Sequence, residues 1–223
     1  AAIATAATLP AVITFARKHG WQATPDERRM HPAPTPDVGG ISMFIGILAA
    51  IVGASLIGDF DPLFKDSTEI IGVVVASAII FALGIVDDIR DISPPAKVTG
   101  VVVAAVALVW FGVTMFQFRL PFLDVFVLSD DWVPLITVLW LLGMTQAINL
   151  IDGLDGLATG IVAIASAAFF VYSRHLGDLG LLAEPNIGPL VAAITCGACV
   201  GFLPHNFNPA KIFMGDSGAL LLG

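Results

Sequence analysis

Seven apolar runs, each near the length that crosses a bilayer as a helix, divide this sequence. About 20 apolar residues span the hydrocarbon core as an α-helix. The runs are Ala1–Ala16, Gly39–Gly58, Ile70–Val86, Val98–Phe116, Trp132–Ile151, Leu157–Tyr172 and Ile187–Leu203. An eighth run begins near Ala219. The sequence therefore predicts an all-α, polytopic membrane helical bundle of about seven complete spans plus the start of an eighth.

The composition agrees with a membrane protein. Of the 223 residues, 57% are hydrophobic and 13% are charged, and the mean hydropathy is +0.92. A water-soluble domain of this size could not cover so much apolar surface. The net charge of −8 excludes a basic nucleic-acid interface. Cys196 and Cys199 lie inside one apolar run, so we expect them to pack in a helix rather than bind a metal or form a disulfide.

The chain is predicted to form a single domain over residues 1–223, because no internal repeat or soluble region interrupts the apolar runs. The sequence stops at Gly223, a few residues into the eighth run. We therefore expect a fragment that lacks the C-terminal spans of a longer protein.

The basic residues predict the orientation of the bundle. Loops after odd-numbered spans share one face, and loops after even-numbered spans share the other. Seven Lys and Arg residues lie on the odd face and three on the even face: Arg17, Lys18, Arg28, Arg29, Arg90, Lys97 and Lys211 against Lys65, Arg119 and Arg174. Because cytoplasmic loops carry the excess of basic residues, the odd face is predicted to be cytoplasmic and the N-terminus to lie outside.

Polar residues between the fifth and sixth runs mark a functional region. The stretch Asn149-Leu-Ile-Asp152-Gly-Leu-Asp155-Gly-Leu157 places two carboxylates and an amide beside hydrocarbon. Ionised groups at that depth are expensive unless they meet a cation, water or a metal. Gly153 and Gly156 favour an ending or broken helix here. A water-exposed acidic loop at a helix end is the plain alternative.

Other acids also lie at the ends of spans on the odd face: Asp87 and Asp88 after the third run and Asp216 before the eighth. Five carboxylates gathered on one surface would repel one another. A divalent metal would relieve this repulsion, and oxygen ligands alone favour Mg²⁺ or Mn²⁺, which use substrate phosphates as further ligands. Lys97 and Lys211 could pair with phosphate oxygens or could only set topology.

Two loops of the odd face add further candidates. His31-Pro-Ala-Pro-Thr-Pro-Asp37-Val-Gly39-Gly40 is stiffened by proline, and its glycine pair permits tight helix contact or close approach of a ligand. The loop from His205 to Gly218 contains Asp216 between small residues. We interpret His31 and His205 as interfacial residues rather than acid-base groups.

Three of these motifs together resemble a known family. Gly84-Ile-Val-Asp87-Asp88 with Lys97, the Asn149–Leu157 stretch, and Asn208-Pro-Ala-Lys-Ile-Phe-Met-Gly-Asp216-Ser-Gly occur in the order found in the polyprenyl-phosphate N-acetylhexosamine-1-phosphate transferase superfamily, of glycosyltransferase 4 type. The sequence of the second motif is most similar to that of the bacterial undecaprenyl-phosphate GlcNAc-1-phosphate transferase branch. Asp37 departs from the basic or neutral residue that relatives often carry at this position.

The resemblance implies an Mg²⁺-dependent phosphotransferase, with Mn²⁺ as an alternative metal. The enzyme would transfer N-acetylhexosamine-1-phosphate from a UDP-sugar to undecaprenyl phosphate, release UMP, and so start the synthesis of a cell-envelope polysaccharide such as lipopolysaccharide or teichoic acid. It implies these site residues: catalytic Asp87 and Asp88, substrate-binding Lys97, Asp152, Asp155, Gly39 and Gly40, and metal ligands Asp216 and Asn149.

The resemblance also implies a bacterial cytoplasmic membrane location, with the active site on the cytoplasmic face. It leaves open a homodimer, the identity of the amino sugar and the length of the lipid. Two alternative functions stay open: a phospho-MurNAc-pentapeptide transferase of peptidoglycan synthesis, and a cation-coupled transporter. A transporter would place acids near the middle of several spans, whereas the acids here lie at span ends and in loops.

Overall fold

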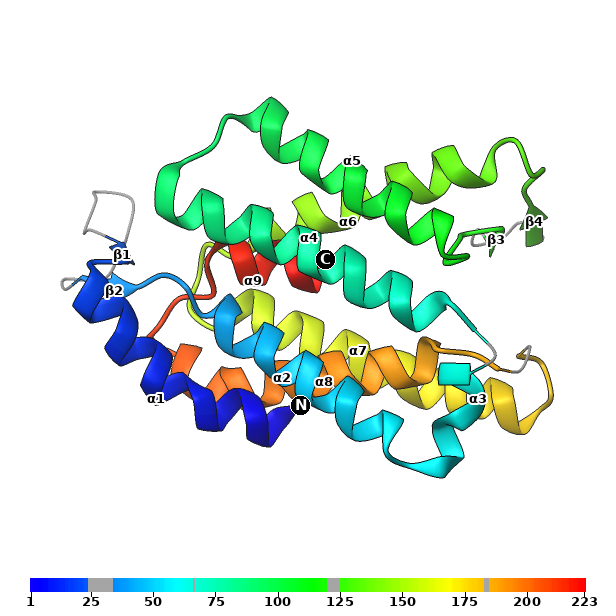
Figure 1. Cartoon of the computed structure of the whole chain (residues 1–223), viewed down its shortest axis with the longest axis horizontal. Helices are drawn as coiled ribbons and strands as arrows, with labels where there is room; N and C mark the ends of the chain where they lie inside the picture. The colour runs from blue at the N-terminus through cyan, green and yellow to red at the C-terminus, as the bar shows by residue number, and fades with distance from the viewer. Residues whose placement is uncertain (24–33, 66, 120–124, 183–184) are drawn as a thin grey trace.

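The structure is a computed structural model that describes residues 1–23, 34–65, 67–119, 125–182 and 185–223. These residues form a helical bundle (Figure 1). Its helices are α1 (Ala2–His19), α2 (Gly40–Ser55), η1 (Gly58–Phe60), α3 (Asp61–Lys65), α4 (Glu69–Arg90), α5 (Pro94–Trp110), α6 (Val133–Ile151), α7 (Leu157–Asp178), α8 (Gly188–Asn206) and α9 (Gly215–Leu222). Each predicted run overlaps one of the long helices, so the helical class is confirmed.

Two short antiparallel ribbons were not predicted. Strand β1 (Gln22–Ala23) pairs with β2 (Thr35–Pro36), and β3 (Gln117–Arg119) pairs with β4 (Val125–Val127). Both lie in connections between helices, where the sequence has no run of alternating residues long enough to indicate a strand. His31, Arg28 and Arg29 lie outside the described residues.

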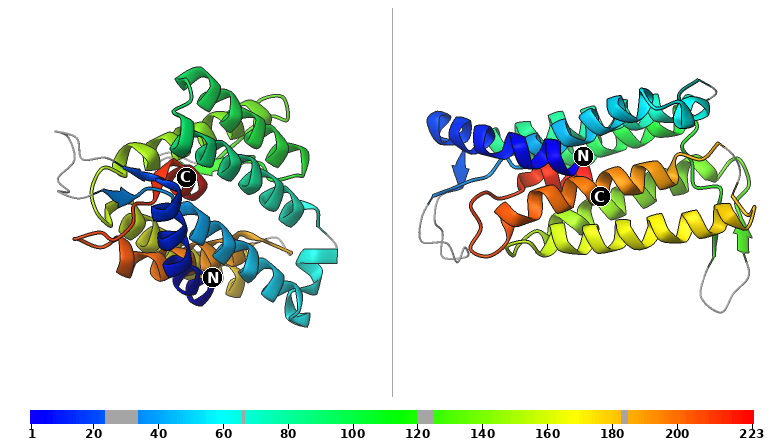
Figure 2. Two further views of the ribbon diagram at one scale, coloured as in Figure 1. Left: turned by 60° about the vertical axis from the view of Figure 1, so that its left-hand side comes forward. Right: turned by 90° about the horizontal axis from the view of Figure 1, so that it is seen from below.

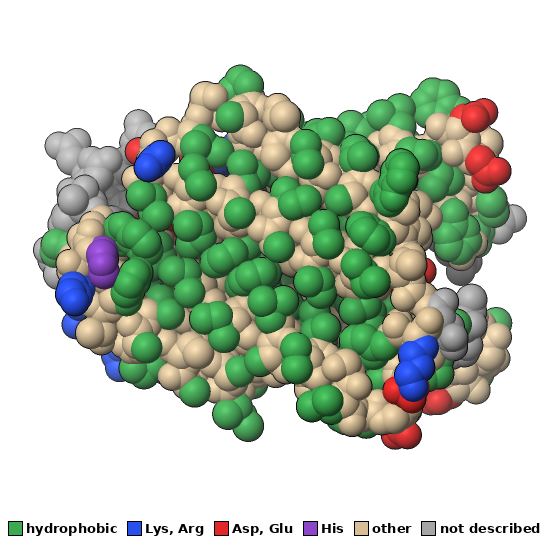
Figure 3. All heavy atoms as spheres, in the orientation of Figure 1, with side chains coloured by type: hydrophobic (Ala, Val, Ile, Leu, Met, Phe, Trp, Pro, Cys, Tyr) green, Lys and Arg blue, Asp and Glu red, His purple; other side chains and the backbone are tan. Residues whose placement is uncertain are grey.

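The predicted number of spans is not confirmed. Among the described residues, four helices are long and apolar enough to cross a membrane: α4, α6, α7 and α8. A fifth candidate is the bent pair formed by α2 and the segment Gly58–Lys65, with an angle of 94° between them. Helix α5 is apolar but shorter. The chain is a polytopic membrane protein, and its apolar side chains cover the flank of the bundle (Figure 3).

The helices pack in two groups. Helices α1, α2, α7 and α8 share one core, which includes Leu9, Met43 and Phe202. Helices α4, α5 and α6 share a second core around Ile80 and Val101. Helices α6 and α7 follow one another in the chain but contact each other little. The bundle is therefore joined chiefly by other elements.

Helix α9 is the main link between the two groups (Figure 2). It packs against α4, α2 and α6. Its neighbouring residues Ala219 and Leu220 are each 1% exposed and belong to different cores. Helix α9 therefore contributes to both cores and lies at the junction of the two groups.

Loops of the predicted odd face gather at one end of the bundle. The C-terminal ends of α1, α4, α6 and α8 and the N-terminal ends of α2, α5, α7 and α9 lie together at the left of Figure 1. Basic side chains mark the left end of the visible surface, and most of its acidic side chains lie at the right end (Figure 3). The assignment of these ends to the two sides of a membrane stays a prediction.

Glycines let α9 enter the bundle. A Cβ atom added to Gly84 of α4 would lie 2.3 Å from the Cα atom of Ser217, and one added to Gly40 of α2 would lie 2.3 Å from the backbone nitrogen of Gly218. Carbon atoms in contact normally stay about 3.5 to 4 Å apart. The backbones of α2, α4 and α9 therefore meet at a distance that only glycine permits.

This packing predicts the effect of adding one methyl group to α4. We expect Gly84→Ala to lower the apparent melting temperature in detergent, because overpacking a close backbone contact costs about 1–3 kcal/mol. Gly143→Ala in α6 is the matched control, since nothing lies within 4 Å of the added Cβ and alanine favours the helix. Equal melting temperatures for the two variants would contradict the close contact.

Candidate active site

The turn between α4 and α5 places three predicted site residues together. Helix α4 ends at Arg90, and Asp91 adopts a left-handed conformation with φ 48°. The Asp87 carboxylate accepts a hydrogen bond from the backbone N–H of Ile92 at 2.9 Å, which holds the reversal of the chain. Pro94 then begins α5, as proline commonly does in a first helical turn. Lys97 consequently lies in that first turn, beside the end of α4.

Lys97 joins three helices through its ammonium group. It forms ion pairs with Asp87 of α4 and with Asp216 of α9. The side chains of Asp87, Lys97 and Asp216 are 7%, 20% and 29% exposed, so all three are largely withdrawn from water. Asn149 of α6 donates its side-chain N–H to the other Asp216 oxygen at 2.9 Å. Four helices thus meet at the Asp216 carboxylate.

Asp88 points to a different partner from its neighbour Asp87. One carboxylate oxygen accepts the backbone N–H of Asp216 at 2.6 Å, and the other accepts the backbone N–H of Ser217 at 3.1 Å. Adjacent helical residues point about 100° apart around the axis, so the two side chains leave α4 in different directions. Asp88 therefore contacts the backbone of α9, whereas Asp87 contacts the lysine.

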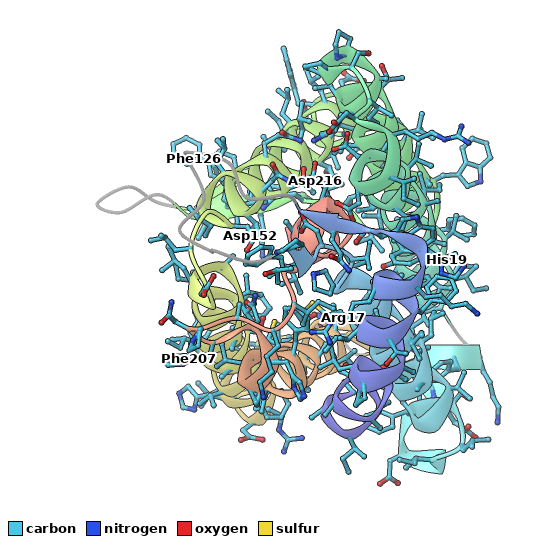
Figure 4. The ribbon with its side chains drawn as sticks, turned by 90° about the vertical axis from the view of Figure 1, so that its left-hand side faces the viewer. Arg17, His19, Phe126, Asp152, Phe207 and Asp216 are labelled. Atoms are coloured by element: carbon cyan, nitrogen blue, oxygen red, sulfur yellow. The ribbon has the colours of Figure 1, made fainter. Side chains whose placement is uncertain are left out.

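The α6–α7 turn carries Asp152 and Asp155. Helix α6 ends at Ile151 and α7 begins at Leu157, after Gly156 with φ 71°, which confirms the predicted helix end at the glycines. Burial, together with the nearby carboxylates of Asp37, Asp216 and Asp88, raises the pKa of the Asp152 carboxyl to about 7. Asp87, Asp88, Lys97 and Asp216 form what we call the acid cluster. Asp152 lies near this cluster, at the same end of the bundle as Asp216 (Figure 4).

Asp155 contacts the last loop instead. One of its carboxylate oxygens accepts hydrogen bonds from the side-chain N–H of Asn208 at 3.1 Å and the backbone N–H of Ala210 at 3.0 Å. Asp155 therefore links the α6–α7 turn to the loop that leads to Asp216. Nucleotide binding by Asp155 stays a prediction.

Gly39 and Gly40 form backbone hydrogen bonds with the segment just before α9. Their N–H groups donate to the carbonyls of Phe213 at 3.0 Å and Met214 at 2.9 Å, and the N–H of Phe213 donates to the carbonyl of Pro36 at 2.8 Å. The structure thus shows tight backbone contact at the glycine pair. Substrate binding by these glycines stays a prediction.

Sequence reasoning gave no role to Asn206, the last residue of α8. Its amide is 2% exposed and makes three hydrogen bonds. The oxygen accepts from the N–H of Gly156 at 3.2 Å and the hydroxyl of Thr159 at 2.9 Å, and the nitrogen donates to the carbonyl of Ile212 at 3.1 Å. Asn206 therefore fastens the α8–α9 loop to the start of α7. Its only sequence signal was a polar residue three positions after an apolar run.

Lys211 and His205 lie apart from the cluster's described contacts. The side chain of Lys211 is exposed, and its backbone N–H donates to the carbonyl of His205 at 2.8 Å. The Nδ1 atom of His205 is buried without a hydrogen-bond partner among the described residues.

Comparison with known proteins assigns the chain to a family. The profile of glycosyl transferase family 4 matches residues 70–223, which include all of the motifs from Asp87 to Asp216. The chain belongs to glycosyl transferase family 4.

Several curated proteins are similar over most of this chain. Decaprenyl-phosphate N-acetylglucosaminephosphotransferase of Mycolicibacterium smegmatis is 39% identical over 95% of the chain and 53% of that protein. The probable undecaprenyl-phosphate N-acetylglucosaminyl 1-phosphate transferase of Bacillus subtilis is 36% identical over 96% of the chain and 56% of that protein. Phospho-N-acetylmuramoyl-pentapeptide-transferase of Mycobacterium bovis is 33% identical over 85% of the chain and 61% of that protein. The chain thus spans about half the length of the curated N-acetylglucosamine relatives it matches.

The donor groups of this family 4 site fit a hard divalent cation by type. Carboxylate and amide oxygens from Asp216 and Asn149 are ligands that Mg²⁺ accepts. Among Asp87, Asp88, Asp152 and Asp216, the described ion pairs provide one cation, Lys97. Within the described ranges, no three His, Cys, Asp or Glu side chains are grouped to hold a metal by themselves. Substrate phosphate would therefore have to complete a coordination shell.

The Asn206 contacts predict a loss of stability. We expect Asn206→Leu to lower the apparent melting temperature strongly, because it leaves two donors and one carbonyl buried without partners, at about 1–3 kcal/mol for each group. Asn208→Ala is the control, because Asn208 is exposed and its side chain donates one hydrogen bond, to Asp155, within the described part of the chain. A melting temperature for Asn206→Leu equal to that of the control would show that the buried amide has little structural weight.

Proposed function

We propose that this family 4 member transfers GlcNAc-1-phosphate from UDP-GlcNAc to a polyprenyl phosphate. A phosphate oxygen of the lipid forms a bond to the β-phosphorus of the UDP-sugar, and the bond from that phosphorus to the bridging oxygen breaks. The bridging oxygen and its electron pair leave with UMP. The products are the lipid-diphospho-sugar and UMP, and the reaction starts the synthesis of a cell-envelope polysaccharide.

The observation that carries this proposal is the convergence of Asp87, Lys97, Asn149 and Asp216 from four helices at one end of the bundle. A reaction between two phosphate groups needs cations and fixed dipoles where negative charge gathers. The site supplies an ammonium group and oxygen ligands for a metal at one point. The names of the similar proteins add the acceptor lipid and the sugar.

Each residue is assigned a role from its position. Asp216 and Asn149 would hold Mg²⁺, which when bound would neutralise charge on the diphosphate and on departing UMP. Lys97 pairs with a diphosphate oxygen, because its ammonium already lies between the two carboxylates of the site. Asp87 faces the same point and orients or deprotonates the lipid phosphate. Asp152 and Asp155, in the adjoining turn, lie toward the nucleotide.

The choice of sugar follows from relative similarity. The N-acetylglucosamine enzymes are 39% and 36% identical to the chain, and the muramoyl-pentapeptide enzyme is 33% identical. We therefore place the chain with the N-acetylglucosamine branch. Membership of a transferase family sets the transporter alternative aside.

We propose that the site faces the cytoplasm of a bacterium. Asp87, Asp88, Asp152 and Asp216 lie at the same end as most of the described basic residues, which are expected on the cytoplasmic side. Nucleotide sugars are cytoplasmic substrates, so this orientation gives them access. A cysteine placed at the exposed position Lys211 should react with an impermeant thiol reagent only from the cytoplasmic side of oriented vesicles.

A product assay tests the reaction. Protein in nanodiscs, supplied with radiolabelled UDP-GlcNAc, undecaprenyl phosphate and Mg²⁺, is expected to form labelled lipid and to release UMP. UDP-MurNAc-pentapeptide is tried in parallel, and a product from it alone would assign the chain to the muramoyl branch. No product from either donor would overturn the proposal.

The two lysines predict unequal effects on that reaction. Lys97→Ala is expected to lower kcat/KM for UDP-GlcNAc by about tenfold to a hundredfold or more, because a charge-assisted contact contributes roughly 1.5–3 kcal/mol. Lys211→Ala is the matched control, since its side chain is exposed and forms no ion pair among the described residues, and a change of only a few fold is expected. An equal loss in both variants would place the diphosphate nearer the Asp216 loop.

A further inference from the structure

The two adjacent acids of α4 differ in what their carboxylates contact. Asp87 contacts the Lys97 ammonium and the N–H of Ile92. Asp88 uses one oxygen for the N–H of Asp216 and the other for the N–H of Ser217. Both Asp88 oxygens therefore have backbone partners in α9, whereas Asp87 faces the other charged groups of the site.

Helix α9 lacks a cap of its own. The first turn of any α-helix has N–H groups without partners inside the helix, and a side chain just before the helix commonly accepts one of them. Met214 holds that position in α9 and makes no such bond. Asp88, more than a hundred residues earlier in the chain, accepts two of these N–H groups. An ionised carboxylate at this place would also suit the positive end of the helix dipole.

The surroundings leave little room for a ligand between Asp88 and α9. A Cβ atom added to Gly215 would lie 2.7 and 2.9 Å from the two Asp88 oxygens and 2.7 Å from the carbonyl oxygen of Asp37. A Cβ atom added to Gly84, one turn before Asp88, would collide with Ser217. The backbone of α9 thus fills the space in front of the Asp88 carboxylate.

We propose that Asp88 is a positioning residue that caps α9 from α4, and that it does not touch the diphosphate. This inference deepens the proposed transferase and rests on it for the link to activity. By fixing the N–H groups of Asp216 and Ser217, Asp88 sets where the Asp216 carboxylate lies relative to Lys97 and Asn149. This assignment replaces the catalytic role that the sequence motif implied for Asp88.

The test compares Asp88→Asn with Asp87→Asn. Asparagine keeps one acceptor oxygen but presents an amide N–H where the second oxygen was, so one capping bond is lost. Hydrogen exchange of the peptide that covers residues 214–222, measured by mass spectrometry in detergent, should become about tenfold faster in Asp88→Asn. Asp87→Asn should change it by less than about twofold, because Asp87 accepts no N–H from α9. Unchanged exchange in Asp88→Asn would overturn the capping role.

Metal dependence tests the link to activity. The Mg²⁺ concentration that gives half-maximal turnover should rise about tenfold in Asp88→Asn, with kcat at saturating Mg²⁺ within a few fold of the wild type, because Asp216 is displaced but present. Asp87→Asn should stay inactive at every Mg²⁺ concentration. Loss of activity in Asp88→Asn that Mg²⁺ cannot restore would assign Asp88 a direct chemical role instead.

A measurement on the wild type keeps the proposal testable if Asp88→Asn does not fold. The N–H groups of Asp216 and Ser217 should exchange slowly for a first helical turn, and fast exchange there would overturn the cap. The exchange experiments need no substrate. They therefore stand even if the chain proves not to be a transferase, whereas the Mg²⁺ titration fails with the proposed function.

Discussion

The close contact of α9 with α2 and α4 is the constraint on which the rest of this structure depends. Helix α9 enters between two groups of helices that otherwise share few contacts. Glycines at positions 40, 84 and 218 make the entry sterically feasible. Because the helix begins at that contact, its second residue, Asp216, lies where α4, α5 and α6 also end or begin. The packing of backbones thereby fixes the position of a charged group.

Charge balance is the second requirement at this end of the bundle. Carboxylates withdrawn from water are unfavourable unless they have cationic or hydrogen-bond partners. The structure provides several kinds of partner at once: the Lys97 ammonium for Asp87 and Asp216, backbone N–H groups for Asp88, and the Asn149 amide for Asp216. Burial and the neighbouring carboxylates raise the pKa of Asp152, which favours its neutral form and lowers the need for a cationic partner. Lys97 thus lies between Asp87 and Asp216, where the substrate phosphate and the metal are proposed to bind.

Hydropathy and motif spacing predicted much of this arrangement. The apolar runs located the long helices, and Gly153 and Gly156 predicted the break between α6 and α7. The parity of the loops predicted that Asp87, Asp152 and Asp216 would share one end. The number of spans was less secure, because α1 and α5 are helical but do not meet the length and hydropathy of a clear span.

Contacts between distant residues could not be predicted in the same way. The sequence gives the types of Asp87 and Asp88 but not the direction of either side chain, because direction depends on how α4 is rotated against α9. The roles of Asn206 and Asp155 in holding the last loop likewise depend on tertiary contacts. From the sequence alone, Asn206 cannot be distinguished from a polar residue exposed at a membrane surface. Its three hydrogen-bond partners in the structure show the difference.

Because Asp87 and Asp88 contact different partners, the rotation of α4 about its axis must be fixed, and the spacing between Gly84 and the two acids determines it. Gly84 faces Ser217, so it fixes which side of α4 lies against α9, and the next turn then directs Asp88 to the backbone and Asp87 to the lysine. One residue inserted between Gly84 and Asp87 would turn both acids by about 100° while leaving composition and hydropathy almost unchanged. Apolar substitutions on the lipid-facing side of α4 are therefore tolerable. An insertion or deletion between Gly84 and the two acids is not.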